Sequence, residues 1–162
     1  MSIKMLPLPA EFLERVWIQR RDDQAQEVQP FVSTHGGEAL RCCVRPALAG
    51  EHVALVSFSP FVRQNAFKEF GPIFMHTTPC EGPPRTPALP VDFDGSNFSF
   101  RAYSAEQVII DATLAPGARA RGAIAALLTR PEVAHVDARF AGYGCFLARF
   151  VRVPEGADGG AC

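Results

Sequence analysis

Polar side chains alternate with apolar ones along two segments, residues 98–103 and 133–140. A period of two is typical of β-strands, in which successive side chains point to opposite faces. If these two strands are neighbours, their polar faces form one patch with the predicted ligand-binding residues Arg101, Tyr103, His135, Asp137 and Arg139. The planar guanidinium of arginine donates two parallel hydrogen bonds and therefore suits a carboxylate or a phosphate. The alternative is an outer sheet face in contact with solvent, which carries weak surface ion pairs.

Cys145 is a candidate catalytic nucleophile because it follows the turn Gly142-Tyr143-Gly144, where a ligand could approach the backbone closely. A catalytic thiol needs a nearby base or positive charge to lower its pKa, and His76 is the candidate base. Cysteine is also among the most buried residue types, and at the start of a strand it is often a small apolar residue. We favour the structural role, and the sequence leaves open whether the chain is an enzyme.

A metal site has weaker support in the sequence. His76 and Cys80 are separated by three residues, whereas zinc sites usually combine two such close ligand pairs. Cys42 and Cys43 fall in an expected strand, so their side chains should point to opposite faces and at most one could join a site. The sequence therefore predicts no metal and no cofactor.

Composition excludes several classes of protein. The 162 residues are 48% hydrophobic and 20% charged, which is enough for one globular domain over residues 1–153, with a flexible Gly-rich tail over residues 154–162. Sixteen basic residues against 17 acidic ones argue against nucleic-acid binding. No apolar run approaches a membrane span and the N-terminus lacks a signal peptide, so we expect a soluble, cytoplasmic protein with free thiols.

The fold class expected from these patterns is α+β, with a mostly antiparallel sheet of about six or seven strands and one or two helices. A short helix that runs into a strand is expected near residues 10–19, and the clearest helix is expected over residues 119–129, before Pro131. Residues 77–92 contain five prolines and should form a loop. The expected strands are residues 40–45, 52–58, 73–76, 98–103, 108–114, 133–140 and 145–153.

Five segments, in this order and spacing, resemble a bacterial family known only as domain-of-unknown-function family 1203. They are Arg41-Cys42-Cys43-Val44-Arg45, Gly71-Pro72-Ile73-Phe74-Met75-His76, Phe100-Arg101-Ala102-Tyr103, Pro131-Glu132-Val133-Ala134 and Gly144-Cys145-Phe146. The resemblance covers roughly residues 38–153 and implies a single-domain bacterial protein of no established activity. Members typically show His-Val-Arg-Asn-Ala before the Gly-Cys pair, and this chain has Asp137 and Phe140 in place of the His and the Asn.

Three functions are compatible with these observations. The first is a module that binds a small anionic molecule on the polar sheet face, with the Pro-rich loop as a lid. The second is a structural or interaction protein that acts as a homodimer. The third is a cysteine-dependent enzyme that uses Cys145, and it ranks last.

Overall fold

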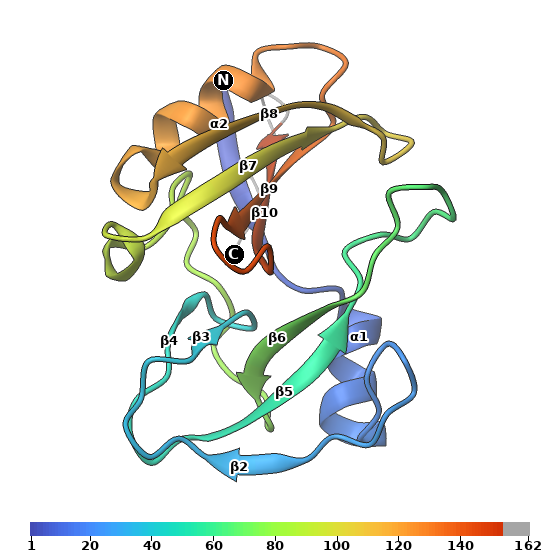
Figure 1. The fold of residues 1–162 in the computed structure, drawn as a ribbon, viewed down its shortest axis with the longest axis vertical. Coiled ribbons are helices and arrows are strands. Elements are labelled where there is room, and N and C mark those ends of the chain that lie inside the picture. Colours follow the sequence, from blue (N-terminus) through green and yellow to red (C-terminus); the bar gives the residue numbers. More distant parts are fainter. Residues whose placement is uncertain (154–162) are drawn as a thin grey trace, which may run out of the picture.

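The computed structural model describes residues 1–153, which form two five-stranded sheets, each covered by a helical segment. Figure 1 shows one sheet with helix α2 in the upper half and the other sheet with helix α1 in the lower half. The fold is therefore α+β, as predicted, although ten strands in two sheets replace the six or seven expected. The tail predicted over residues 154–162 lies outside the described residues.

The first sheet is antiparallel throughout and has the order β1-β10-β9-β7-β8. Its strands are β1 (Ser2–Leu6), β7 (Asn97–Tyr103), β8 (Ile109–Pro116), β9 (His135–Phe140) and β10 (Phe146–Val153). One face packs its apolar residues against α2 (Ala120–Leu128), and this core includes Phe98, Phe100, Val136 and Phe150. The opposite face carries the polar residues, which the strand alternation placed correctly.

The second sheet has the order β2-β5-β6-β3-β4. Its strands are β2 (Pro30–Val32), β3 (Ala39–Leu40), β4 (Arg45–Pro46), β5 (His52–Phe58) and β6 (Gly71–His76), and only the pairing of β3 with β6 is parallel. Helix α1 (Ala10–Glu14) continues as a π-helical turn over Arg15–Gln19, and both pack on this sheet. Phe12, Val16 and Phe58 belong to the resulting second core.

Two local predictions are wrong. Residues 15–19 continue the helix instead of forming a strand, because Phe12 and Val16 lie one turn apart and are buried together. Residues 40–45 are not one strand but a tight hairpin, in which residues 41–44 form the turn between β3 and β4. Val44 closes that turn with a φ of 52°, a value that β-branched residues rarely adopt.

The other expected elements are present with small shifts at their ends. In strand β5, Leu55 is about half exposed, whereas Val53, Val56 and Phe58 are buried. Within residues 1–153, none of the helices is long and apolar enough to cross a membrane.

Candidate functional site

The polar face of the first sheet is a buried layer, not a solvated surface. Strands β7 and β9 pair so that Arg101 lies opposite Asp137 and Tyr103 lies opposite His135. Asp137 is fully buried and accepts two hydrogen bonds from Arg149 of β10, at 2.7 and 2.9 Å. A carboxylate can remain charged at such a depth only with a partner of this kind.

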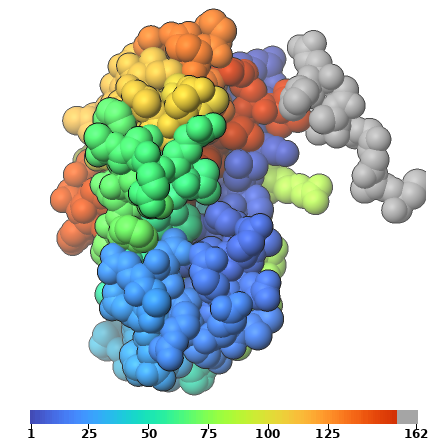
Figure 2. Space-filling model, turned by 90° about the vertical axis from the view of Figure 1, so that its right-hand side faces the viewer, coloured from blue at the N-terminus to red at the C-terminus, as the bar shows by residue number. Residues whose placement is uncertain are grey.

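A segment between the two sheets, residues 59–70, covers this polar layer. In Figure 2 it is the green part that lies against the yellow strands of the upper half. Its backbone is held by Gln107, whose side-chain oxygen accepts hydrogen bonds from the amides of Val62 and Arg63 at 2.9 Å each. Arg149 donates to the carbonyl of Pro60 at 2.9 Å, and the ring of Phe61 packs edge-on against Tyr103. The layer therefore excludes water because a distant stretch of chain lies over it.

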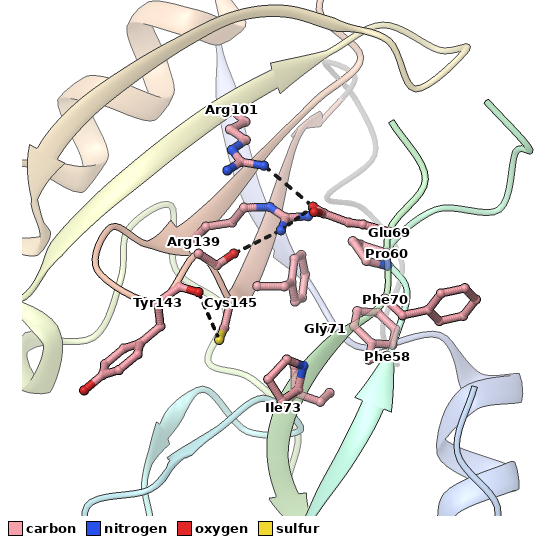
Figure 3. Close-up of a pocket in the computed structure, with 13 residues that line it drawn as sticks. Phe58, Pro60, Glu69, Phe70, Gly71, Ile73, Arg101, Arg139, Tyr143 and Cys145 are labelled. Atoms are coloured by element: carbon pink, nitrogen blue, oxygen red, sulfur yellow. Dashed lines mark hydrogen bonds and ion pairs between the residues drawn. The ribbon is translucent and has the colours of Figure 1, made fainter. Parts of the chain in front are cut away.

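A cavity of about 220 Å³ opens where this segment meets the polar layer, and Figure 3 shows its lining. Arg101 and Arg139 converge there on one carboxylate oxygen of Glu69, at 3.6 and 2.5 Å. Arg139 is only 4% exposed, and its Nη1 also donates to the carbonyl of Gly144 at 3.1 Å. Its Nε and Nη2 have no hydrogen-bond partner among the described residues. The charged groups of Arg101, Arg139 and Glu69 form the polar part of the lining, and four apolar side chains also border the cavity: Phe58, Phe70, Ile73 and Phe146. We call this cavity the arginine pocket.

A second cavity of about 440 Å³ adjoins the arginine pocket and shares Pro72, Tyr143 and Cys145 with it. Leu55, Phe74 and Phe140 give it an apolar lining, and Arg41 also borders it. Burial lowers the pKa of the Arg41 guanidinium to about 10.

The five predicted ligand-binding residues lie on one face of one sheet, but only two of them border the arginine pocket. Arg101 and Arg139 line it, whereas Tyr103, His135 and Asp137 lie deeper in the buried layer. The rings of Tyr103 and His135 stack with centroids 5.1 Å apart, and Tyr103 is fully buried, so burial raises the pKa of its phenol. The Pro-rich loop is not a lid over the arginines, because residues 77–92 do not line this pocket and residues 59–70 cover the face instead.

The structure places the two catalytic candidates in different sites. Cys145 borders the arginine pocket, and within residues 1–153 its thiol has a single hydrogen-bond partner, the carbonyl of Tyr143 at 3.7 Å. The His76 ring instead lies beside Cys42 and Cys43. No histidine lies within hydrogen-bond distance of Cys145 in the described part of the chain, so the predicted pairing with His76 lacks direct contact.

His76 is the centre of a second cluster, which we call the cysteine cluster: Cys42, Cys43, His76 and Cys80. One ligand atom of each residue lies within 4.8 Å of all the others. The imidazole Nδ1 is 3.4 Å from Cys42 Sγ and 3.8 Å from Cys43 Sγ. The inference that adjacent cysteines must diverge is wrong here, because both lie in the turn of the hairpin and not in a strand.

Charged residues surround the cysteine cluster on the side of the His76 Nε2. Glu51 Oε1 lies 3.2 Å from this nitrogen, and Arg45 holds the carboxylate with two hydrogen bonds at 2.9 and 2.6 Å. The Arg45 hydrogen bonds lower the pKa of Glu51 to about 2. The neighbouring Cys42 thiol lowers the pKa of Cys43, and Cys43 in turn raises the pKa of Cys42.

The comparison with protein families gives one match: the family described as "Protein of unknown function (DUF1203)" matches residues 37–152. The chain belongs to this family. The matched region contains every residue of both the arginine pocket and the cysteine cluster, and it confirms the resemblance seen in the sequence motifs. No curated protein and no solved structure matches the chain.

Sequence reasoning missed four residues that the geometry brings into these sites: Glu69, Arg149, Glu51 and Arg45. Arg149 lay within an expected strand, but nothing in the sequence gave its register against Asp137. Glu69 and Glu51 lie outside any polar alternation, and their roles depend on contacts between distant segments. Cys80 was recognised, although only as part of an isolated pair.

His135 makes the stability of the protein depend on pH. Burial lowers its pKa to about 4, against the opposing effect of Asp137, while Arg149 acts in the same direction as burial. In the unfolded chain His135 is protonated below about pH 6.5, whereas in the folded chain it stays neutral until about pH 4. The free energy of unfolding therefore falls as the pH falls from about 6.5 to about 4. We expect the free energy of unfolding to drop by up to about 3 kcal/mol from this group.

Urea denaturation at a series of pH values between 4 and 7 measures this loss in the wild type and in His135→Asn. The difference between the two curves isolates His135, since the other titrating groups are common to both. Parallel curves over the whole window would show that His135 is not responsible.

Proposed function

We propose that this protein binds a small anion, a carboxylate or a phosphate, between Arg101 and Arg139. The observation that carries the proposal is the convergence of two guanidinium groups on a single oxygen of Glu69 in a cavity. Two cations share one carboxylate, and the Nε and Nη2 of Arg139, which carry three N–H donors between them, have no partner within residues 1–153. Buried donors of this kind favour an additional oxyanion.

Glu69 marks the place where the oxyanion of a ligand would lie. Its side chain is 44% exposed and comes from a segment without regular secondary structure, so its ion pairs are weakly held. A ligand with two or three anionic oxygens can engage both guanidinium groups at once, which one carboxylate oxygen cannot do well. In this proposal Glu69 is an internal competitor that closes the pocket until an anion displaces it.

The dimensions of the cavity restrict the ligand. A volume of about 220 Å³ is below that of pockets for drug-sized molecules, so the anion is small. The adjoining apolar cavity leaves room for an apolar substituent beyond Tyr143 and Cys145. Nearly equal numbers of acidic and basic residues argue that the pocket takes an isolated anion, not a polyanionic strand.

Isothermal titration with inorganic phosphate and with acetate tests the proposal, with sodium chloride at equal ionic strength as the reference. We expect Glu69→Gln to bind the better of the two anions about tenfold more tightly than the wild type. Arg101→Gln is expected to bind it about tenfold more weakly, because a charge-assisted hydrogen bond contributes about 1.5–3 kcal/mol.

Arg63→Gln is the matched control, since Arg63 is exposed in the same segment and does not line the pocket. Its affinity should equal that of the wild type. The proposal fails if Glu69→Gln binds neither anion more tightly, or if Arg63→Gln loses as much affinity as Arg101→Gln. The homodimer alternative remains a prediction, and native mass spectrometry of the same samples measures it.

A further inference from the structure

The cysteine cluster has the composition of a zinc site. Cys42, Cys43 and Cys80 offer sulfur and His76 offers nitrogen, and three cysteines with one histidine are a set that holds structural Zn²⁺. Soft thiolate ligands select zinc over magnesium or calcium, which prefer oxygen. We propose that this protein binds one structural Zn²⁺ ion through Cys42, Cys43, His76 and Cys80.

The distances between the ligand atoms fit a tetrahedral ion. Zinc–sulfur bonds of about 2.3 Å and zinc–nitrogen bonds of about 2.0 Å place the ligand atoms roughly 3.5–3.8 Å apart. The His76 Nδ1 lies 3.4 Å from one thiol and 3.8 Å from the other, and all four atoms lie within 4.8 Å of one another. The side chains therefore need only small adjustments to close around an ion.

The surroundings of His76 match those of a metal ligand. A histidine that binds a metal usually donates its other ring N–H to a carboxylate, which fixes the tautomer and orients the ring. Here Nδ1 faces the thiols and Nε2 lies 3.2 Å from Glu51 Oε1. Glu51 is itself fixed by Arg45 and by the amide of Leu48 at 2.7 Å.

The backbone also prepares the site. The amide of His76 points at Cys42 Sγ, 3.3 Å away, and is therefore placed to donate a hydrogen bond to a zinc-bound sulfur. The positive φ of Val44 lets the hairpin present two adjacent cysteines to the same histidine. A β-branched residue in this conformation is strained, and such strain concentrates at ligand-holding positions. The partial exposure of Cys80, beside a cavity lined by Cys43 and Gly82, leaves a route for the ion from solvent.

A zinc ion at this site would act as a cross-link within the fold. The four ligands come from the β3–β4 hairpin, the end of β6 and the Pro-rich loop, so one ion would tie three segments together. Four protein ligands complete a tetrahedron and leave no open position for substrate, so the ion is structural rather than catalytic. The sequence pattern predicts no metal, because it does not show the hairpin that brings Cys42 and Cys43 to the same histidine.

Metal content measured on the full chain provides the test. Protein unfolded with a chelator and refolded in reducing buffer should take up one Zn²⁺ per chain, counted by native mass spectrometry. Its melting temperature should rise on zinc addition, since metal binding couples to folding. Cobalt(II) in place of zinc should give the visible absorption bands of a tetrahedral thiolate site.

Three variants locate the site. Cys80→Ser should lose stoichiometric zinc and the cobalt bands. Glu51→Gln, which leaves all four ligands in place, should weaken zinc binding by about 10–100-fold. Cys145→Ser is the matched control, because Cys145 is also a free, partly buried cysteine but lies outside the cluster, and it should bind zinc as the wild type does. Circular dichroism is the control for whether each variant is folded.

Three results would overturn the proposal. The first is refolded wild-type protein without stoichiometric zinc. The second is equal loss of zinc in Cys145→Ser and Cys80→Ser. The third is a disulfide among Cys42, Cys43 and Cys80 that persists in reducing buffer, because it would make the cluster a structural disulfide in place of a metal site. None of these measurements depends on anion binding at the arginine pocket, so the two proposals fail independently.

Discussion

Replacing Asp137 by asparagine is expected to lower the free energy of unfolding by about 3–5 kcal/mol. Asp137 is fully buried and neutralises Arg149 through two hydrogen bonds. Asparagine has nearly the same shape but no charge. Arg149 would then remain in the layer with Arg101 and Arg139, and within residues 1–153 Glu69 would be the one carboxylate left in contact with these arginines. Removing one partner of a buried ion pair leaves the other charge uncompensated, and this lowers the free energy of unfolding by far more than the intact pair contributes to it. Urea denaturation followed by circular dichroism measures the loss.

Asp111→Asn supplies the matched control for this change. Asp111 also pairs with an arginine, Arg130 at 2.8 Å, but the two side chains are 48% and 41% exposed. An exposed pair of this kind contributes at most about 1 kcal/mol, so this variant should be close to the wild type. Equal losses in both variants would mean that the layer around Asp137 is open to water, and the burial argument would then be wrong.

The polar face of the first sheet illustrates what strand alternation can predict. The period of two assigned Arg101, Tyr103, His135, Asp137 and Arg139 to one face, and the pairing of β7 with β9 brings them together. The same pattern could not show that the face is buried. Burial comes from residues 59–70, which have no periodicity and are held by Gln107, about 40 residues later in the chain.

The hairpin at residues 39–46 illustrates what the pattern cannot predict. Apolar residues without a turn signal favour a continuous strand, and adjacent cysteines in a strand diverge. Val44 instead adopts a positive φ. Glycine or asparagine at this position would have indicated such a turn in the sequence, but valine does not. The short strands β1 and β2 were missed for a related reason. They contain five and three residues, which is too short for a clear alternation of polar and apolar side chains. Each is a strand because it pairs with a longer one, β1 with β10 and β2 with β5.

Strand β6 connects the two candidate sites. Its first residues, Gly71 to Ile73, line the arginine pocket, and its last residue, His76, belongs to the cysteine cluster. At about 3.3 Å per residue the two ends lie on the order of 17 Å apart. A zinc ion that fixes the end of β6 would therefore hold the strand that forms one wall of the anion pocket. The family match covers both ends of this strand.

Replacing Gly117 by alanine is expected to destabilise the protein by about 3 kcal/mol, at the upper end of the cost of overpacking. Gly117 is buried, and a Cβ on it would lie 2.1 Å from the carbonyl oxygen of Phe93. Because the obstacle is backbone, no side chain can rotate away. The Phe93 ring packs against Phe98 and Phe140, so a shift of its backbone disturbs the core beneath the first sheet. Thermal and urea denaturation measure the effect.

For Gly122→Ala, which is the same chemical change, we expect the opposite effect on stability. Gly122 lies in helix α2, is exposed, and an added Cβ would meet nothing within 4 Å. Alanine is the better helix former by about 1 kcal/mol, so this variant should be more stable than the wild type. The pair separates steric cost from the general effect of losing a glycine. A neutral Gly117→Ala beside a stabilised Gly122→Ala would show that the segment at Phe93 can move, and that this corner of the core is looser than the contact at 2.1 Å implies.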